Sequence, residues 1–103
     1  MGPKVALIGR LWEGEVEMLR ARTDDTDLVA LLAFYSREIA TEYLTFSEEL
    51  QGEGWGVVEV DLLDLAAICA AFGVGYIALP TEFGLGGAAV GSALDMLDVL
   101  ASR

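Results

Sequence analysis

Eight consecutive apolar residues, at positions 28–35, place the tightest constraint on how this chain can fold. The run follows a polar turn at 23–27 and stops at Ser36, a residue type that often caps a helix. An apolar run of this length is typical of a strand covered on both faces of its sheet. It is far shorter than the roughly 20 apolar residues that cross a bilayer. The sequence therefore predicts a layered α/β protein with this strand near its centre.

Strand and helix patterns alternate along the rest of the chain. The expected strands lie at 5–8, 28–35, 57–62, 74–79 and within 82–90, and the expected helices lie at 13–22, 36–51, 65–72 and from Ser92 onward. Their order is βαβαβαββα. This order predicts a single domain over residues 1–103, with a mixed central sheet and right-handed parallel crossovers in its first part.

The first helix is expected at 13–22 because of side-chain spacing and charge. Trp12, Val16 and Leu19 fall on one helical face, glutamates crowd the start of the segment, and arginines lie at its end. This distribution matches the helix dipole, which favours negative charge at the N-terminus and positive charge at the C-terminus.

The charge of the chain restricts its partners. With 17 acidic and 6 basic residues, the formal net charge is −11. Such a surface opposes nucleic acid and anionic lipid, which both require clustered Lys and Arg. It favours a basic protein or peptide, because opposite fields speed their encounter. The first residues lack the pattern of a secretory signal, which predicts a cytoplasmic protein.

Two absences limit the chemistry. The chain has no histidine, the commonest general base and metal ligand, and we expect neither a metal site nor a cofactor. Its one cysteine, Cys69, has no second thiol with which to form an internal disulfide. Cys69 lies in an apolar helical segment, where a thiol normally behaves as a small hydrophobic group.

Several local strings, in this order and spacing, resemble the thioredoxin superfamily over roughly residues 28–100. They are Ala33-Phe34-Tyr35, Glu59-Val60-Asp61, Phe72-Gly73-Val74, the Gly86-Gly87 turn and Val90-Gly91. The resemblance implies a thioredoxin-like fold. The positions that would hold the Cys-x-x-Cys motif fall near 39–42, which read Ile-Ala-Thr-Glu. No thiolate can form there, so the resemblance implies a redox-inactive protein that is not an enzyme.

Two residues compete for the place of that family's cis-proline. Pro80 matches by residue type, whereas a gapless match from Asp61 to Phe83 places Ala78 there. A cis bond before alanine would cost about 2.5–4 kcal/mol, so we expect a trans bond before Ala78.

Within the superfamily, the chain resembles the hydrogenase-maturation accessory proteins, which are acidic, lack the CxxC motif, and are thought to act as chaperones for a precursor with a twin-arginine signal. This resemblance implies a redox-inactive chaperone or protein-binding module. The expected partner site is the start of the second helix, where an exposed Ile39 beside acidic side chains would receive a basic peptide. Its residues are Ser36, Arg37, Glu38, Ile39 and Glu42.

Two other functions remain open at this point. One is a monothiol redox protein that works through Cys69, and the other is a structural subunit that pairs an edge strand, such as 57–62, with a second copy. The oligomeric state does not follow from the sequence. Trp12 and Trp55 are large enough to anchor an interface, and equally suited to a core.

Overall fold

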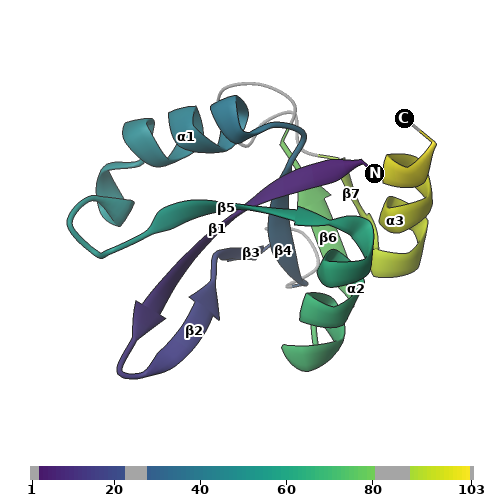
Figure 1. Cartoon of the computed structure of the whole chain (residues 1–103), viewed down its shortest axis with the longest axis horizontal. Coiled ribbons are helices and arrows are strands. Elements are labelled where there is room, and N and C mark those ends of the chain that lie inside the picture. Colours follow the sequence, from purple (N-terminus) through teal and green to yellow (C-terminus); the bar gives the residue numbers. More distant parts are fainter. Residues whose placement is uncertain (1–2, 23–27, 81–88, 103) are drawn as a thin grey trace.

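A computed structural model describes residues 3–22, 28–80 and 89–102, and it has three layers (Figure 1). A mixed β-sheet forms the middle layer. Helix α1 (Arg37–Phe46) covers one face, and α2 (Leu62–Ala71) and α3 (Ala93–Ala101) cover the other. The mixed α/β class expected from the sequence is therefore confirmed. No helix in the described ranges is long and apolar enough to cross a membrane.

The sheet contains seven strands within the described residues. They are β1 (Lys4–Trp12), β2 (Glu15–Met18), β3 (Arg20–Arg22), β4 (Val29–Phe34), β5 (Gly56–Asp61), β6 (Tyr76–Leu79) and β7 (Ala89–Ser92). β4 and β6 pair in parallel, and β7 is antiparallel to β6. β1 lies between β4 and β5 and is antiparallel to both.

The expected crossovers are therefore correct only in part. β4, β5 and β6 run in one direction and are joined through α1 and α2, as strand–helix alternation predicts. The first strand runs against them, so the parallel crossover expected between residues 5–8 and 28–35 is wrong.

The helix expected at 13–22 is also wrong, because this segment forms strands. Glu13 and Gly14 make a two-residue turn with φ angles of 51° and 82°, the left-handed backbone that tight hairpins require. β2 then returns antiparallel to β1, with Trp12 opposite Glu15 and Arg10 opposite Glu17. Residues 9–18, which we call the hairpin arm, project from the body of the molecule (Figure 1).

β1 and β3 occupy the same strand position beside β4, and the arm lies between them in the chain. The first half of β1 lies along the end of β4, and β3 lies along its beginning. Ile8 and Leu19 close the base of the arm, with the Leu19 amide donating to the Ile8 carbonyl at 2.8 Å. The Leu19 carbonyl turns the other way and accepts from the Leu32 amide at 3.2 Å. The chain therefore leaves the sheet at Ile8 and rejoins it at Leu19.

The remaining elements lie close to their expected positions. The apolar run forms β4, whose residues after Val29 are all buried. The helix expected at 36–51 ends earlier, at Phe46, and a short 3₁₀ turn, η1 (Glu48–Leu50), follows. Asp61 caps α2, which begins three residues earlier than expected, and Ser92 caps α3 at its expected start. The Gly86-Gly87 turn and most of the strand expected within 82–90 lie outside the described residues.

Two buried clusters hold the layers together. Alternate residues of β1 and β4 point to opposite faces, as strand geometry requires. Leu7 and Leu31 pack with Leu65 and Leu100 beneath α2 and α3. On the other face, Ile8, Leu32, Phe34 and Ala40 pack beneath α1. The expectation of a trans bond before Ala78 is confirmed, and the bond before Pro80 is trans as well.

Candidate functional site

The start of α1, where the sequence places a partner site, is held by local contacts. Ser36 caps the helix, and its Oγ accepts a hydrogen bond from the Ile39 amide at 3.2 Å. The Arg37 guanidinium lies 3.7 Å from a carboxylate oxygen of Glu59 on β5. Glu38 and Glu42 are exposed. The five predicted residues thus share one helix start, and two of them have clear structural tasks.

The apolar residue of this expected site, Ile39, differs from the prediction in its exposure. Ile39 is only partly accessible and packs against the cluster beneath α1. The helix begins with its apolar stripe already turned towards β4, because the sheet below it offers an apolar surface to bury. Ile39 is therefore less exposed than expected, and the partner site at the start of α1 stays a prediction.

Cys69 is 5% exposed and lies in the cluster beneath α2 and α3. Burial raises the pKa of its thiol, because a charged thiolate is poorly solvated there. The thiolate is the nucleophile in thiol chemistry. The surroundings of Cys69 therefore weigh against the monothiol alternative.

Labelling of Cys69 with a thiol reagent tests this assignment. We expect the native protein to react at least about a hundred times more slowly than the urea-unfolded chain, since reaction requires an opening of the core. The native rate should rise with pH through the ordinary thiol range, because the opened state exposes the thiol, whereas burial raises the pKa in the closed state and keeps it unreactive. Fast native labelling near neutral pH would contradict the structural role.

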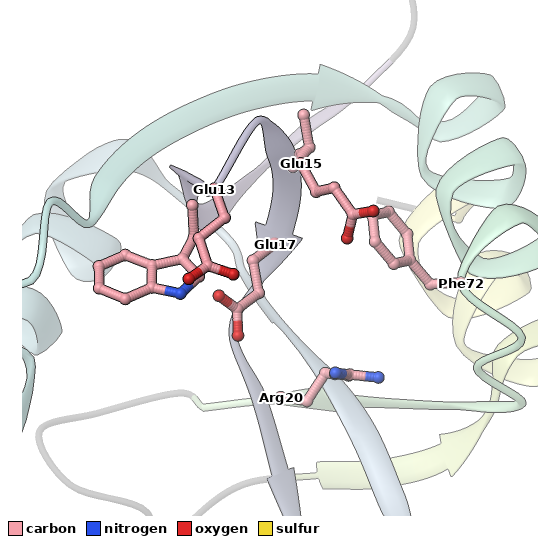
Figure 2. Close-up of a pocket in the computed structure, with 7 residues that line it drawn as sticks. Glu13, Glu15, Glu17, Arg20 and Phe72 are labelled. Carbon is pink, nitrogen blue, oxygen red and sulfur yellow. The ribbon is translucent and has the colours of Figure 1, made fainter.

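A different concave surface lies beside the hairpin arm (Figure 2). This hollow has a volume of about 490 Å³. Its walls come from the arm, from the beginning of β3 and from the C-terminal end of α2, and they consist of Trp12, Glu13, Glu15, Val16, Glu17, Arg20 and Phe72. In Figure 2 the Glu15 carboxylate points towards the ring of Phe72. The hollow therefore joins segments that are far apart in the sequence.

The charge inside the hollow is mostly negative. Its lining includes three acidic residues and one basic residue, Arg20. Glu17 is already engaged, because its Oε2 accepts from Nε of Arg10 at 2.9 Å. Glu13 and Glu15 lie at the exposed end of the arm. Among the described residues, no group of three or more acidic, Cys or His side chains is placed to hold a metal ion. The lining combines carboxylates with aromatic rings, and both groups bind organic cations.

The aromatic wall formed by Trp12 is fixed from behind by Arg10. The guanidinium carbon of Arg10 lies 4.6 Å from the ring centre of Trp12 and 4.4 Å from that of Trp55. Its Nη1 also reaches Oε2 of Glu53 at 3.3 Å. Arg10 is therefore held between two indole rings and two carboxylates. Because Trp55 packs against the core, this stack ties the arm to the body of the protein.

Sequence reasoning named Trp12 as a possible interface residue but missed the hollow. Local patterns place the three glutamates of the arm at the start of one helix and Phe72 at the end of another. Glu13-Gly14 is a local signal of the hairpin, since a glycine inside an expected helix also fits a tight turn.

Comparisons of the chain with protein-family models, with curated proteins and with solved structures found no match.

Proposed function

We propose that this protein is a non-catalytic binding module whose hollow receives a basic segment of a protein partner. The observation that carries the proposal is the meeting of three carboxylates with two aromatic rings around one concave surface. Lysine and arginine side chains bind both to carboxylates and to the faces of aromatic rings. The net charge of −11 supports the same class of partner, because it attracts basic chains from a distance.

The expected affinity is modest. Carboxylates at the protein surface contribute about 0–1 kcal/mol each to an ion pair, and a partly exposed cation–π contact contributes about 0.5–1 kcal/mol. A few such contacts yield a dissociation constant on the order of millimolar. A short basic peptide should therefore bind reversibly, and the affinity should fall as salt screens the charges.

The twin-arginine partner and the thioredoxin-like fold expected from the sequence are part of this proposal. A precursor with a twin-arginine signal, the partner implied by the hydrogenase-accessory resemblance, is a basic segment of the required kind. The thioredoxin-like assignment rests on element order, and the succession from β4 to α3 supports it. Two features differ from the expected element order and weaken this assignment. They are the hairpin in place of the first helix and the position of β1 between β4 and β5.

Two pairs of charge-neutralising substitutions test where a basic peptide binds. The double variant Glu13→Gln, Glu15→Gln should weaken binding of acetylated hexalysine by about five- to tenfold, because it removes two carboxylates from the hollow. The matched control is Glu38→Gln, Glu42→Gln on α1, which changes the net charge equally at the site first expected from the sequence. Isothermal titration calorimetry at low salt measures both.

The control should lose less than about twofold, an amount that reflects the general field alone. A larger loss in the control than in the arm variant would move the site back to the start of α1. Equal small losses in both would mean that hexalysine senses only net charge, and the hollow would then have no binding role.

A further inference from the structure

The outer edge of β2 forms one side of the hollow and adds a second means of recognition. In the described part of the sheet, β2 is a terminal strand that pairs only with β1. A terminal strand presents backbone amides and carbonyls that an extended peptide can use.

The hydrogen-bonding pattern of the arm shows which residues of β2 present these backbone groups. In an antiparallel pair, residues that exchange hydrogen bonds alternate with residues that do not. The Leu19 amide bonds to the Ile8 carbonyl, so Ile8–Leu19 is a bonded pair, and Arg10–Glu17 and Trp12–Glu15 follow in register. The backbone groups of Val16 and Met18 therefore point away from β1, along the outer edge of β2.

The side chains of the arm determine what kind of strand fits this edge. Glu15 and Glu17 share one face of the arm with Arg10 and Trp12. Val16 shares the opposite face with its cross-strand neighbour Leu11, and the two are 56% and 71% exposed. An added strand would thus meet carboxylates on one face and apolar side chains on the other.

We infer that an extended peptide with alternating basic and apolar residues adds to the edge of β2 as an antiparallel strand. This inference rests on the proposed function and specifies the form of the bound segment. The basic side chains lie beside Glu15 and Glu17, and the apolar ones extend the patch of Leu11 and Val16. In this register the apolar residues of the peptide exchange backbone hydrogen bonds with Val16 and Met18, because paired residues in an antiparallel ladder share a face.

A backbone-methylated peptide tests the inference on the unaltered protein. The probe is acetyl-Lys-Val-Lys-Val-Lys-Val-amide. Methylating its valine amides removes the donors that would face β2 and should weaken binding by about tenfold or more. Methylating its lysine amides, which would face solvent, is the matched control and should cost less than about threefold. Hydrogen exchange should slow at the Val16 and Met18 amides when the unmethylated probe binds.

A protein variant provides an independent check. Val16→Pro removes the outward amide and leaves the β1–β2 ladder intact, since proline is tolerated where a strand amide faces outward. We expect it to lower affinity for the alternating peptide by about tenfold, whereas Val16→Thr, which keeps the amide and the branched shape, should lower it by less than about threefold. Near-native tryptophan fluorescence would show that the arm is still formed.

The outcomes separate the inference from the function on which it rests. Binding that is insensitive to either methylation, or sensitive only to methylated lysine amides, would overturn strand addition and leave the hollow as a cation site. If hexalysine does not bind, or if its binding does not depend on Glu13 and Glu15, both strand addition and the proposed function would be overturned.

Discussion

Replacing Phe34 with alanine should lower the free energy of unfolding by about 3–5 kcal/mol, the usual cost of truncating a buried phenylalanine. Phe34 ends β4 and is fully buried beneath α1. Its ring lies 5.2 Å from the ring of Tyr43, centre to centre, at an angle of 50°. Both neighbouring layers are fixed in place around it, so alanine leaves a cavity that the sheet cannot close.

Such a loss is a large part of the total stability, since small domains are stable by about 5–15 kcal/mol. Urea unfolding followed by far-UV circular dichroism measures the change in midpoint and slope. The control is Phe46→Ala at the C-terminal end of α1, where the same chemical change affects a residue that is 72% exposed. It should cost less than about 1 kcal/mol. Equal losses at Phe34 and Phe46 would contradict the placement of the core.

The central strands and the last two helices were predictable because local and long-range forces agree there. The run at 28–35 is apolar whichever partner it meets, and burial on both faces follows from its composition alone. The segments that form α2 and α3 are short apolar runs preceded by Asp61 and Ser92, whose side chains cap the helices. For such segments the tertiary fold only places an element that the sequence already specifies.

The segment 13–22 shows where this agreement ends. Its charges and its apolar spacing fit a helix, but Val16 and Met18 alternate with Glu15 and Glu17, so they fit a strand equally well. The contacts that decide between the two lie elsewhere. Arg10 must reach Trp55 and Glu53, about forty residues away in the chain, and that distance is invisible to local patterns. Tertiary contacts of this kind override propensity.

The same separation hid the candidate site. The hollow requires the arm to fold back on β1 and the end of α2 to lie beside it, and neither condition is written in one segment. The family resemblance points instead to the start of α1. Ile39 was expected to be exposed because the helical stripe alone does not reveal how far around the helix the sheet extends.

Arg10→Met should loosen the hairpin arm and weaken binding of the alternating peptide by about tenfold. The Arg10 side chain is 14% exposed, and its guanidinium stacks on Trp12 and Trp55 and bonds to Glu17. Methionine keeps the length of the side chain but cannot make the ion pairs or the two cation–π contacts. Without them, Trp12 no longer forms a fixed wall of the hollow.

The readouts are peptide affinity and the emission maximum of the tryptophans, which should move towards the value for water-exposed indole. Arg20→Met is the matched control, because it removes the same charge from a residue that also lines the hollow. There the guanidinium opposes a bound cation, so its loss should strengthen binding by about two- to fivefold.

The two variants therefore separate the positioning of Trp12 by Arg10 from the effect of net charge. Both make the protein more negative by one unit, and if net charge alone controlled binding, both would bind a basic peptide more tightly. Arg10 acts as a positioning residue only if its loss weakens binding and shifts the emission while the loss of Arg20 does the opposite to affinity and leaves the emission unchanged. Tighter binding in both variants would mean that the stack of Arg10 between Trp12 and Trp55 stabilises the arm but has no part in recognition.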